Sequence, residues 1–110
     1  MDLKISTRVV GSVTILEVSG EIELSNAAQL REALMRACHD EQPGLVVDMS
    51  GVAFIDSTGI GVLVGALKRA RECNGAFVLA CPQRRVRRVF EITGLLSVFA
   101  LSATVEDALR

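Results

Sequence analysis

The chain has 110 residues, which is enough for one domain with its own hydrophobic core and too short for two. Half of the residues are hydrophobic, 23% are charged and the net charge is -1, a composition typical of a globular protein. The absence of Trp and Tyr and the lack of a basic excess argue against a nucleic-acid site built on aromatic stacking. We therefore expect a single domain over residues 1–110 that makes no direct contact with nucleic acid.

The three cysteines are Cys38, Cys73 and Cys81, an odd number without a Cys-x-x-Cys pair. This pattern is typical of a reducing compartment, and with one histidine it offers no metal-binding constellation. No apolar run approaches the roughly 20 residues of a membrane-spanning helix, and the first residues lack the apolar core of a signal peptide. The sequence thus predicts a cytoplasmic protein without membrane insertion.

The amino-terminal part predicts a hairpin followed by a helix. Two β-branched runs, residues 3–10 and 13–19, flank Gly11-Ser12, whose glycine suits the positive φ of a type II′ turn. After a short crossing at residues 20–24, Ser25 is the predicted N-cap of a helix. The apolar face of that helix consists of Ala27, Leu30, Leu34, Ala37 and Cys38.

The remaining elements alternate between strands and helices. Residues 45–49, interrupted only by Asp48, and residues 52–55 predict two buried strand pieces before a helix at 57–71. Residues 76–80 predict a strand, Gln83 opens a helix that Gly94 ends, and residues 98–101 predict a last strand. Thr104 and Asp107 resemble the capping box of a terminal helix. The order predicts an α/β domain with a mixed sheet, in which an antiparallel hairpin precedes mainly parallel strands, and about four helices.

Inward faces follow from the same periodicity. In the helix at 57–71 the predicted inward residues are Ile60, Leu63, Val64 and Leu67, and in the next helix they are Val86, Val89, Phe90 and Thr93. The basic residues Arg84, Arg85, Arg87 and Arg88 then form an outer face that serves a partner or is simply solvated.

The most informative motif is Ile55-Asp56-Ser57-Thr58-Gly59, at the junction of a buried strand and a helix. A serine hydrolase would need Gly-x-Ser-x-Gly and a histidine base, but the first glycine is missing and His39 lies far along the chain. Gly59, Gly61 and Gly65 resemble a loosened dinucleotide fingerprint, yet the chain is too short for that fold and Asp56 would repel a pyrophosphate. Nucleotide binding remains a minor alternative, and the glycines more simply allow close approach of the backbone.

Two interpretations of Ser57 remain open on the residues alone. Serine before a helix is usually its N-cap. A helix N-terminus also accommodates an anion, so a phosphate on Ser57 would be tolerated and would place added negative charge beside Asp56. The two interpretations are compatible.

Nearly the whole chain resembles the STAS-domain family of bacterial anti-sigma factor antagonists. The resemblance rests on LVVDMSGVAFIDSTGIGVLVGALKRAR, on the run from Arg84 to Val89, and on Phe90-Glu91-Ile92-Thr93-Gly94-Leu95. Gly20 and Glu23 stand where the family typically has a glycine followed three residues later by an aspartate, so Glu23 keeps the charge and adds a methylene.

The resemblance implies a regulatory protein rather than an enzyme, without a cofactor. It implies that the unphosphorylated protein binds an anti-sigma factor with serine kinase activity, so that a sigma factor is released. Phosphorylation at Ser57, with Thr58 as the alternative acceptor, would end this binding, and a serine phosphatase would restore it. The implied partner-binding residues are Glu23, Asp56, Ser57, Thr58 and Gly59.

Other members of the family imply a different role. On that reading the chain is a constitutive accessory or scaffold subunit of a lipid transporter or of a stress-signalling assembly. The oligomeric state is left open by the sequence.

Overall fold

The computed structural model of the chain describes residues 3–38 and 44–110. These ranges contain five strands, β1 (Lys4–Val10), β2 (Val13–Ile22), β3 (Gly44–Ile55), β4 (Phe77–Ala80) and β5 (Ala100–Ser102). They also contain four helices, α1 (Ala27–Ala37), α2 (Ser57–Glu72), α3 (Arg84–Ile92) and α4 (Val105–Ala108). The predicted order of elements is confirmed. His39 lies outside the described residues, and so do residues 40–43, where the proline of Asp40-Glu41-Gln42-Pro43-Gly44 predicts a loop after the first helix.

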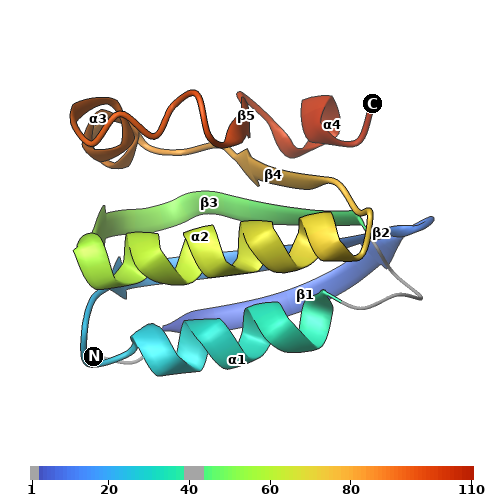
Figure 1. Cartoon of the computed structure of the whole chain (residues 1–110), viewed down its shortest axis with the longest axis horizontal. Coiled ribbons are helices and arrows are strands. Elements are labelled where there is room, and N and C mark those ends of the chain that lie inside the picture. Colours follow the sequence, from blue (N-terminus) through green and yellow to red (C-terminus); the bar gives the residue numbers. More distant parts are fainter. Residues whose placement is uncertain (1–2, 39–43) are drawn as a thin grey trace.

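The strands form one mixed sheet in which spatial order follows chain order, β1-β2-β3-β4-β5 (Figure 1). β1 and β2 are antiparallel, and each later strand is parallel to the one before it. The predicted mixed sheet, with a hairpin followed by parallel strands, is therefore confirmed.

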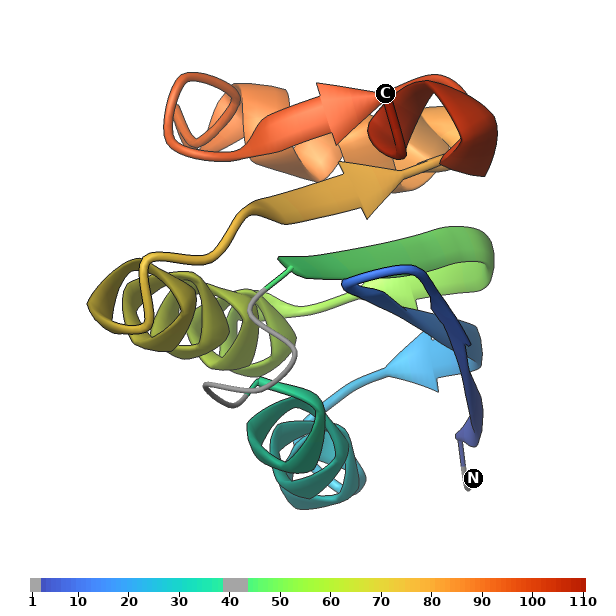
Figure 2. The same ribbon diagram turned by 90° about the vertical axis from the view of Figure 1, so that its right-hand side faces the viewer.

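Helices cover both faces of the sheet, unequally. Figure 2 shows α1 and α2 on one side and α4 on the other. Because successive side chains of a strand point to opposite faces, Leu16 and Val47 enter the larger apolar cluster with α1 and α2, whereas Ile15 and Val46 enter a smaller one with Val105 of α4. Complete burial of such side chains contributes about 2 kcal/mol each, and this packing holds the strand ends and helix starts in place.

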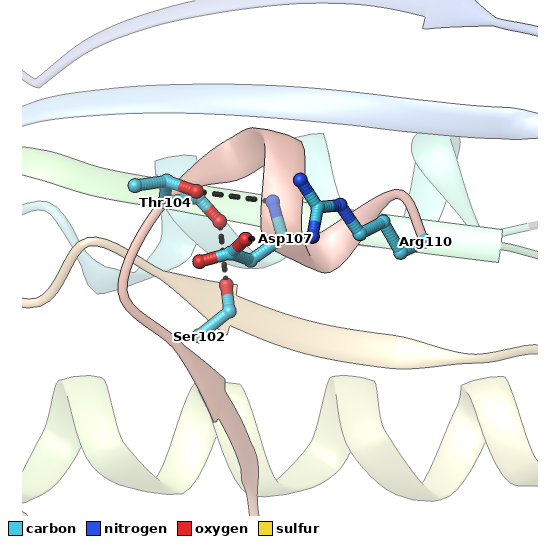
Figure 3. A network of polar contacts seen from close by, with 4 residues as sticks. All are labelled: Ser102, Thr104, Asp107 and Arg110. Carbon is cyan, nitrogen blue, oxygen red and sulfur yellow. Dashed lines mark hydrogen bonds and ion pairs between the residues drawn. The ribbon is translucent and has the colours of Figure 1, made fainter.

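Three short-range signals act as predicted. Gly11 has a φ of 62° in the hairpin, and Gly94 has a φ of 74° after α3. Beyond Gly94, the Leu95 N–H donates to the Phe90 carbonyl at 2.8 Å, which completes a Schellman ending. The Thr104 hydroxyl accepts the Asp107 N–H at 3.0 Å and caps α4, as Figure 3 shows.

Several boundaries differ from the sequence-based expectation. β2 continues to Ile22, and β3 runs unbroken from Gly44 to Ile55 instead of forming two pieces. β3 continues through Gly51 because this residue pairs with Ser19 of β2. A glycine is needed there, since a Cβ would lie 2.5 Å from the Ser19 Cβ. β5 lies at Ala100–Ser102, later than predicted, because its pairing with β4 begins at Ala100.

Two further details differ from the sequence-based expectation. Thr93, predicted to face inward, is exposed, and its hydroxyl donates to the Val89 carbonyl at 2.8 Å, whereas Val64 is half-buried and packs against the core as predicted. α2 ends at Glu72, one residue later than predicted, and Asn74 takes a left-handed φ of 56° just beyond it. The Gly75 N–H then donates to the Ala70 carbonyl at 2.8 Å.

The three cysteines lie in the described part of the chain, and none of them forms a disulfide. Cys38 is buried at the end of α1, and burial together with the neighbouring Cys73 thiol raises the pKa of Cys38. Burial, followed by the charge of Asp48, also raises the pKa of Cys81. Among the described residues, no helix is both long and apolar enough to cross a membrane.

Candidate functional site

The candidate site lies where β2 and β3 end and α1 and α2 begin, at the left of Figure 1. Ile22 and Ile55 are paired in the parallel register, and the Asp56 N–H donates to the Ile22 carbonyl at 3.1 Å. Because parallel strands end at the same edge of a sheet, Glu23 and Asp56 follow these two residues side by side. The structure thus brings together two acidic residues that are 33 positions apart in the chain.

The Asp56 carboxylate connects this edge to α2. Its Oδ1 accepts the Gly59 N–H at 3.0 Å and its Oδ2 accepts the Leu24 N–H at 3.1 Å. The expectation that Ser57 is the N-cap is therefore wrong, since Asp56 has the extended backbone of a cap (φ -102°, ψ -178°) and its carboxylate reaches the third residue of the helix. The charge of Asp56 is held in one place by two backbone donors.

Ser57 is the first residue of α2, and its side chain is exposed. Because Asp56 caps the helix, the Ser57 hydroxyl is not used as a cap. It makes no hydrogen bond within the part of the chain that the structure describes. The first turn of a helix has N–H groups without helical acceptors. Gly59 gives its N–H to Asp56, whereas those of Ser57 and Thr58 have no acceptor within the helix. The hydroxyl is accessible, and an anion attached to it meets the positive end of the helix.

Glu23 lies in a loop that other side chains fix. The Ser25 hydroxyl donates to Glu23 Oε1 at 2.6 Å, and the Glu23 N–H donates to Asn26 Oδ1 at 2.9 Å. Asn26 Nδ2 also donates to the Glu21 carbonyl at 2.7 Å, and Asn26 is only 4% exposed. The predicted Ser25 cap is wrong, because Asn26 precedes α1 and its buried amide holds the loop instead.

Asn26 is the site residue that the sequence analysis missed. An asparagine directly before a helix is a recognised cap signal, which could have singled it out. In this structure, however, its side chain makes no capping hydrogen bond to α1. It accepts the Glu23 N–H instead and so closes the loop around Glu23. A loop-closing role of this kind depends on contacts that local sequence rules do not describe.

The neighbouring residues differ in accessibility. Thr58 is half-buried, and Gly59 is buried with a hypothetical Cβ only 2.5 Å from Ile22 Cγ2. Gly59 therefore permits α2 to approach the strand ends, as expected of a glycine that allows close approach. Gly61 and Gly65 do not share that role, since a Cβ on either would meet nothing within 4 Å.

A surface groove begins beside Ser57 and runs between α1 and α2. Its volume is about 470 Å³, and several of the α2 residues that line it, among them Gly61 and Gly65, are small. Exposed apolar side chains lie nearby in the fold, with Leu24 76% exposed in the loop that Asp56 holds and Met35 37% exposed on α1. The groove is lined by Arg31, Met35, Thr58, Gly61, Val62, Gly65, Arg69 and Glu72.

The arginines of α3 form the predicted outer face. All four are exposed, and Arg87 pairs with Glu91 on the same helix at 3.7 Å. This surface belongs to a different element from the site at Ser57, and its role stays a prediction.

The profile of the STAS domain matches residues 4–108, and the chain belongs to this family. The chain is 33% identical over 95 residues to an anti-sigma-B factor antagonist of Bacillus subtilis, covering 86% of each chain. It is 38% identical over 86 residues to an anti-sigma-B factor antagonist of Listeria monocytogenes, covering 76% of this chain and 74% of the relative.

A solved structure shows the same fold. The crystal structure of an anti-sigma factor antagonist from Mycobacterium paratuberculosis superposes with a TM-score of 0.88 at 31% identity, covering 97% of this chain and 91% of that one. The family resemblance expected from the sequence is thereby confirmed.

Proposed function

We propose that this protein is an anti-sigma factor antagonist controlled by phosphorylation of Ser57. In the unphosphorylated state it binds an anti-sigma factor with serine kinase activity, and a sigma factor is released. The observation that carries the proposal is an exposed, unbonded Ser57 hydroxyl next to a carboxylate that two backbone N–H groups hold in place. The similarity to anti-sigma-B factor antagonists supports the choice of partner.

The proposed binding surface surrounds Ser57. It includes Glu23 and Asp56 at the strand ends and Thr58 at the start of the groove. It also includes Gly59, whose missing side chain allows α2 to pack closely against Ile22. Ser57 is a better acceptor than Thr58, because Ser57 is exposed and Thr58 is half-buried. The kinase partner supplies the ATP, so this chain needs no cofactor and acts as a substrate rather than as an enzyme.

The proposed switch is electrostatic. A phosphate adds roughly -1.5 to -2 charges beside Asp56, whose carboxylate cannot turn away without losing its bonds to Gly59 and Leu24. For charges roughly 6 Å apart at an effective dielectric near 20, each unit repulsion is about 2 to 3 kcal/mol. In the free protein water screens the same repulsion to below about 1 kcal/mol. Burial in an interface therefore adds about 2 kcal/mol, which corresponds to about one to two decades of affinity.

The fold itself should tolerate the modification. The N–H groups of Ser57 and Thr58 at the positive end of α2 favour an anion there. The effect of the phosphate therefore falls on the partner complex rather than on folding. A serine phosphatase would return the protein to its binding state, in the bacterial cytoplasm where sigma factors act.

Phosphorylation can be tested with a purified anti-sigma factor kinase and ATP. Mass spectrometry should locate the phosphate on Ser57, and Ser57→Ala should remain unmodified. The matched control Ser12→Ala, at an exposed serine in the hairpin turn at the other end of β2, should be modified as the wild type is. A phosphate found outside Ser57 and Thr58 would refute the site.

Binding gives a second test. Ser57→Ala should retain affinity for the anti-sigma factor, and Ser57→Asp should bind about tenfold or more weakly at low salt, with a smaller difference at high salt. Equal affinities would exclude the electrostatic switch. Permanent binding to a transporter or scaffold component, insensitive to both variants, would favour the constitutive-subunit alternative.

A further inference from the structure

The outer side of β1 is a regular edge with unpaired backbone groups. β1 lies at one end of the sheet, and no described strand pairs with its outer side. Its register with β2 is regular from Lys4 opposite Ser19 to Val10 opposite Val13. Proteins usually protect such edges with proline, bulges, very short strands or charged side chains. β1 carries Lys4 and Arg8, but it has seven residues, no proline and no bulge. The opposite edge, β5, has only three residues.

The hairpin determines which groups are free. With a two-residue loop, Val10 and Val13 form a hydrogen-bonded pair, and such pairs alternate along the strand. Lys4, Ser6, Arg8 and Val10 therefore bond β2, and the backbone groups of Ile5, Thr7 and Val9 point outward.

Hydrogen bonds at the start of the hairpin agree with this alternation. Leu3 lies two residues before Ile5, so its backbone groups also point outward. The Leu3 N–H donates to Gln29 Oε1 at 3.3 Å, and Gln29 Nε2 donates to the Leu3 carbonyl at 3.0 Å. The Gln29 amide thus satisfies the outward groups of Leu3 as a neighbouring strand would. Three residues, Ile5, Thr7 and Val9, are left for a strand from outside the domain.

We propose that β1 of a second copy occupies this edge, antiparallel and related by a two-fold axis at Thr7. In that register Thr7 lies opposite Thr7 of the second copy and Ile5 lies opposite its Val9. All three outward residues of each copy then lie opposite outward residues of the other. Every outward N–H and C=O group of these residues therefore has a hydrogen-bonding partner in the second copy. Lys4 faces Val10, and no like charges lie directly opposite each other.

Apolar side chains on the α1 side favour the same register. Ile5, Thr7 and Val9 line a groove of about 480 Å³ against α1, and Val9 is 58% exposed there. Pairing would set Ile5 of the second copy directly beside Val9. Each copy would thereby cover apolar surface that is open to water in the single chain.

Charge complementarity on the opposite face supplies the second argument. The Ser6 hydroxyl donates to Glu17 Oε1 of β2 at 3.3 Å. In the proposed register Arg8 lies opposite Ser6 of the second copy, two strand spacings or about 10 Å from that copy's Glu17. The long arginine side chain can extend over Ser6 to this carboxylate, and symmetry produces the contact twice.

This dimer is independent of the proposed switch. The axis at Thr7 lies opposite Leu16 in the middle of β2, whereas Ser57 follows the end of β3. Both copies of Ser57 therefore remain accessible. A contact of one strand per copy is small, and we expect dissociation at roughly 0.1 mM chain concentration.

Amide hydrogen exchange measured by NMR at about 20 µM and 1 mM tests the proposed pairing. The amides of Ile5, Thr7 and Val9 should become protected only at the higher concentration, while those of Ser6 and Arg8 are protected at both. Sedimentation should show a dimer at the higher concentration. A monomer at 1 mM, or a dimer without this alternating protection, would overturn the proposal.

Variants provide a check on register. Arg8→Glu and Glu17→Arg should each weaken dimerisation about tenfold, and the double variant should restore it. Arg84→Glu on α3 is the matched control and should dimerise as the wild type does. Thr7→Pro removes an outward N–H while leaving the bonds to β2, so it should yield a folded monomer by circular dichroism. A dimer unaffected by Arg8→Glu and Thr7→Pro would refute the proposal.

Discussion

Replacing Asp56 by alanine removes one carboxylate that serves two backbone donors. The Gly59 N–H, 3.0 Å from Oδ1, loses its cap at a cost of about 1 kcal/mol, and loss of a negative charge at the helix start costs about 0.3 to 1 kcal/mol more. The Leu24 N–H, 3.1 Å from Oδ2, is exposed and regains water, so its loss costs only about 0.5 kcal/mol. We expect Asp56→Ala to lower the free energy of unfolding by about 2 kcal/mol.

Asp56→Asn separates the two contributions. Its single carbonyl oxygen can accept from Gly59 or from Leu24 but does not carry the charge, so the expected loss is about 1 kcal/mol. Thr104→Ala is the matched control, because it removes one cap of similar geometry, at 3.0 Å from the Asp107 N–H, without removing a charge or a second bond. It should also cost about 1 kcal/mol.

Urea denaturation followed by far-UV circular dichroism is the appropriate assay, since the chain has no Trp or Tyr for intrinsic fluorescence. Two outcomes would refute the reasoning. In the first, Asp56→Ala is within about 0.5 kcal/mol of the wild type. In the second, Asp56→Asn is as damaging as Asp56→Ala, which would mean that the remaining carbonyl oxygen does not replace either bond.

Further predictions concern glycines, a helix end and a thiol. Gly59→Ala should destabilise by about 1 to 3 kcal/mol, because its Cβ would come within 2.5 Å of the core, whereas Gly65→Ala, facing open space, should stabilise by about 0.5 to 1 kcal/mol in urea titrations. Asn74→Gly should raise the free energy of unfolding by about 1 kcal/mol in urea titrations, since glycine adopts the φ of 56° without strain. An unchanged free energy of unfolding would contradict this. Burial raises the pKa of Cys38, so iodoacetamide should modify this thiol far more slowly in the native protein at pH 8 than in urea, as peptide mass mapping would show; equal rates would contradict the burial.

Short-range rules predicted the parts of the fold that neighbouring residues decide. Gly11, Gly94 and Thr104 all act as expected, because a positive φ or a capping hydroxyl is a local property. The continuity of β3 through Gly51 depends instead on pairing with β2 across a bulge, which no local pattern contains. Fold class was therefore more predictable than the ends of individual strands.

The candidate site shows the same division. That Glu23 and Asp56 share an edge follows from parallel strand order, and the family resemblance is confirmed by the STAS profile. Both predicted serine caps were wrong: the Asp56 carboxylate, one residue before Ser57, caps α2, and α1 begins after Asn26, one residue beyond Ser25, without a side-chain cap. The roles of Ser57 and its neighbours in partner binding remain predictions.

The sequential strand order has a consequence for synthesis. Each strand of β1-β2-β3-β4-β5 pairs with the strand made immediately before it. The hairpin can form while α1 is still emerging from the ribosome, and every later strand adds to an edge that already exists. No early strand has to wait, exposed, for a distant partner, which reduces the time during which an incomplete sheet can aggregate.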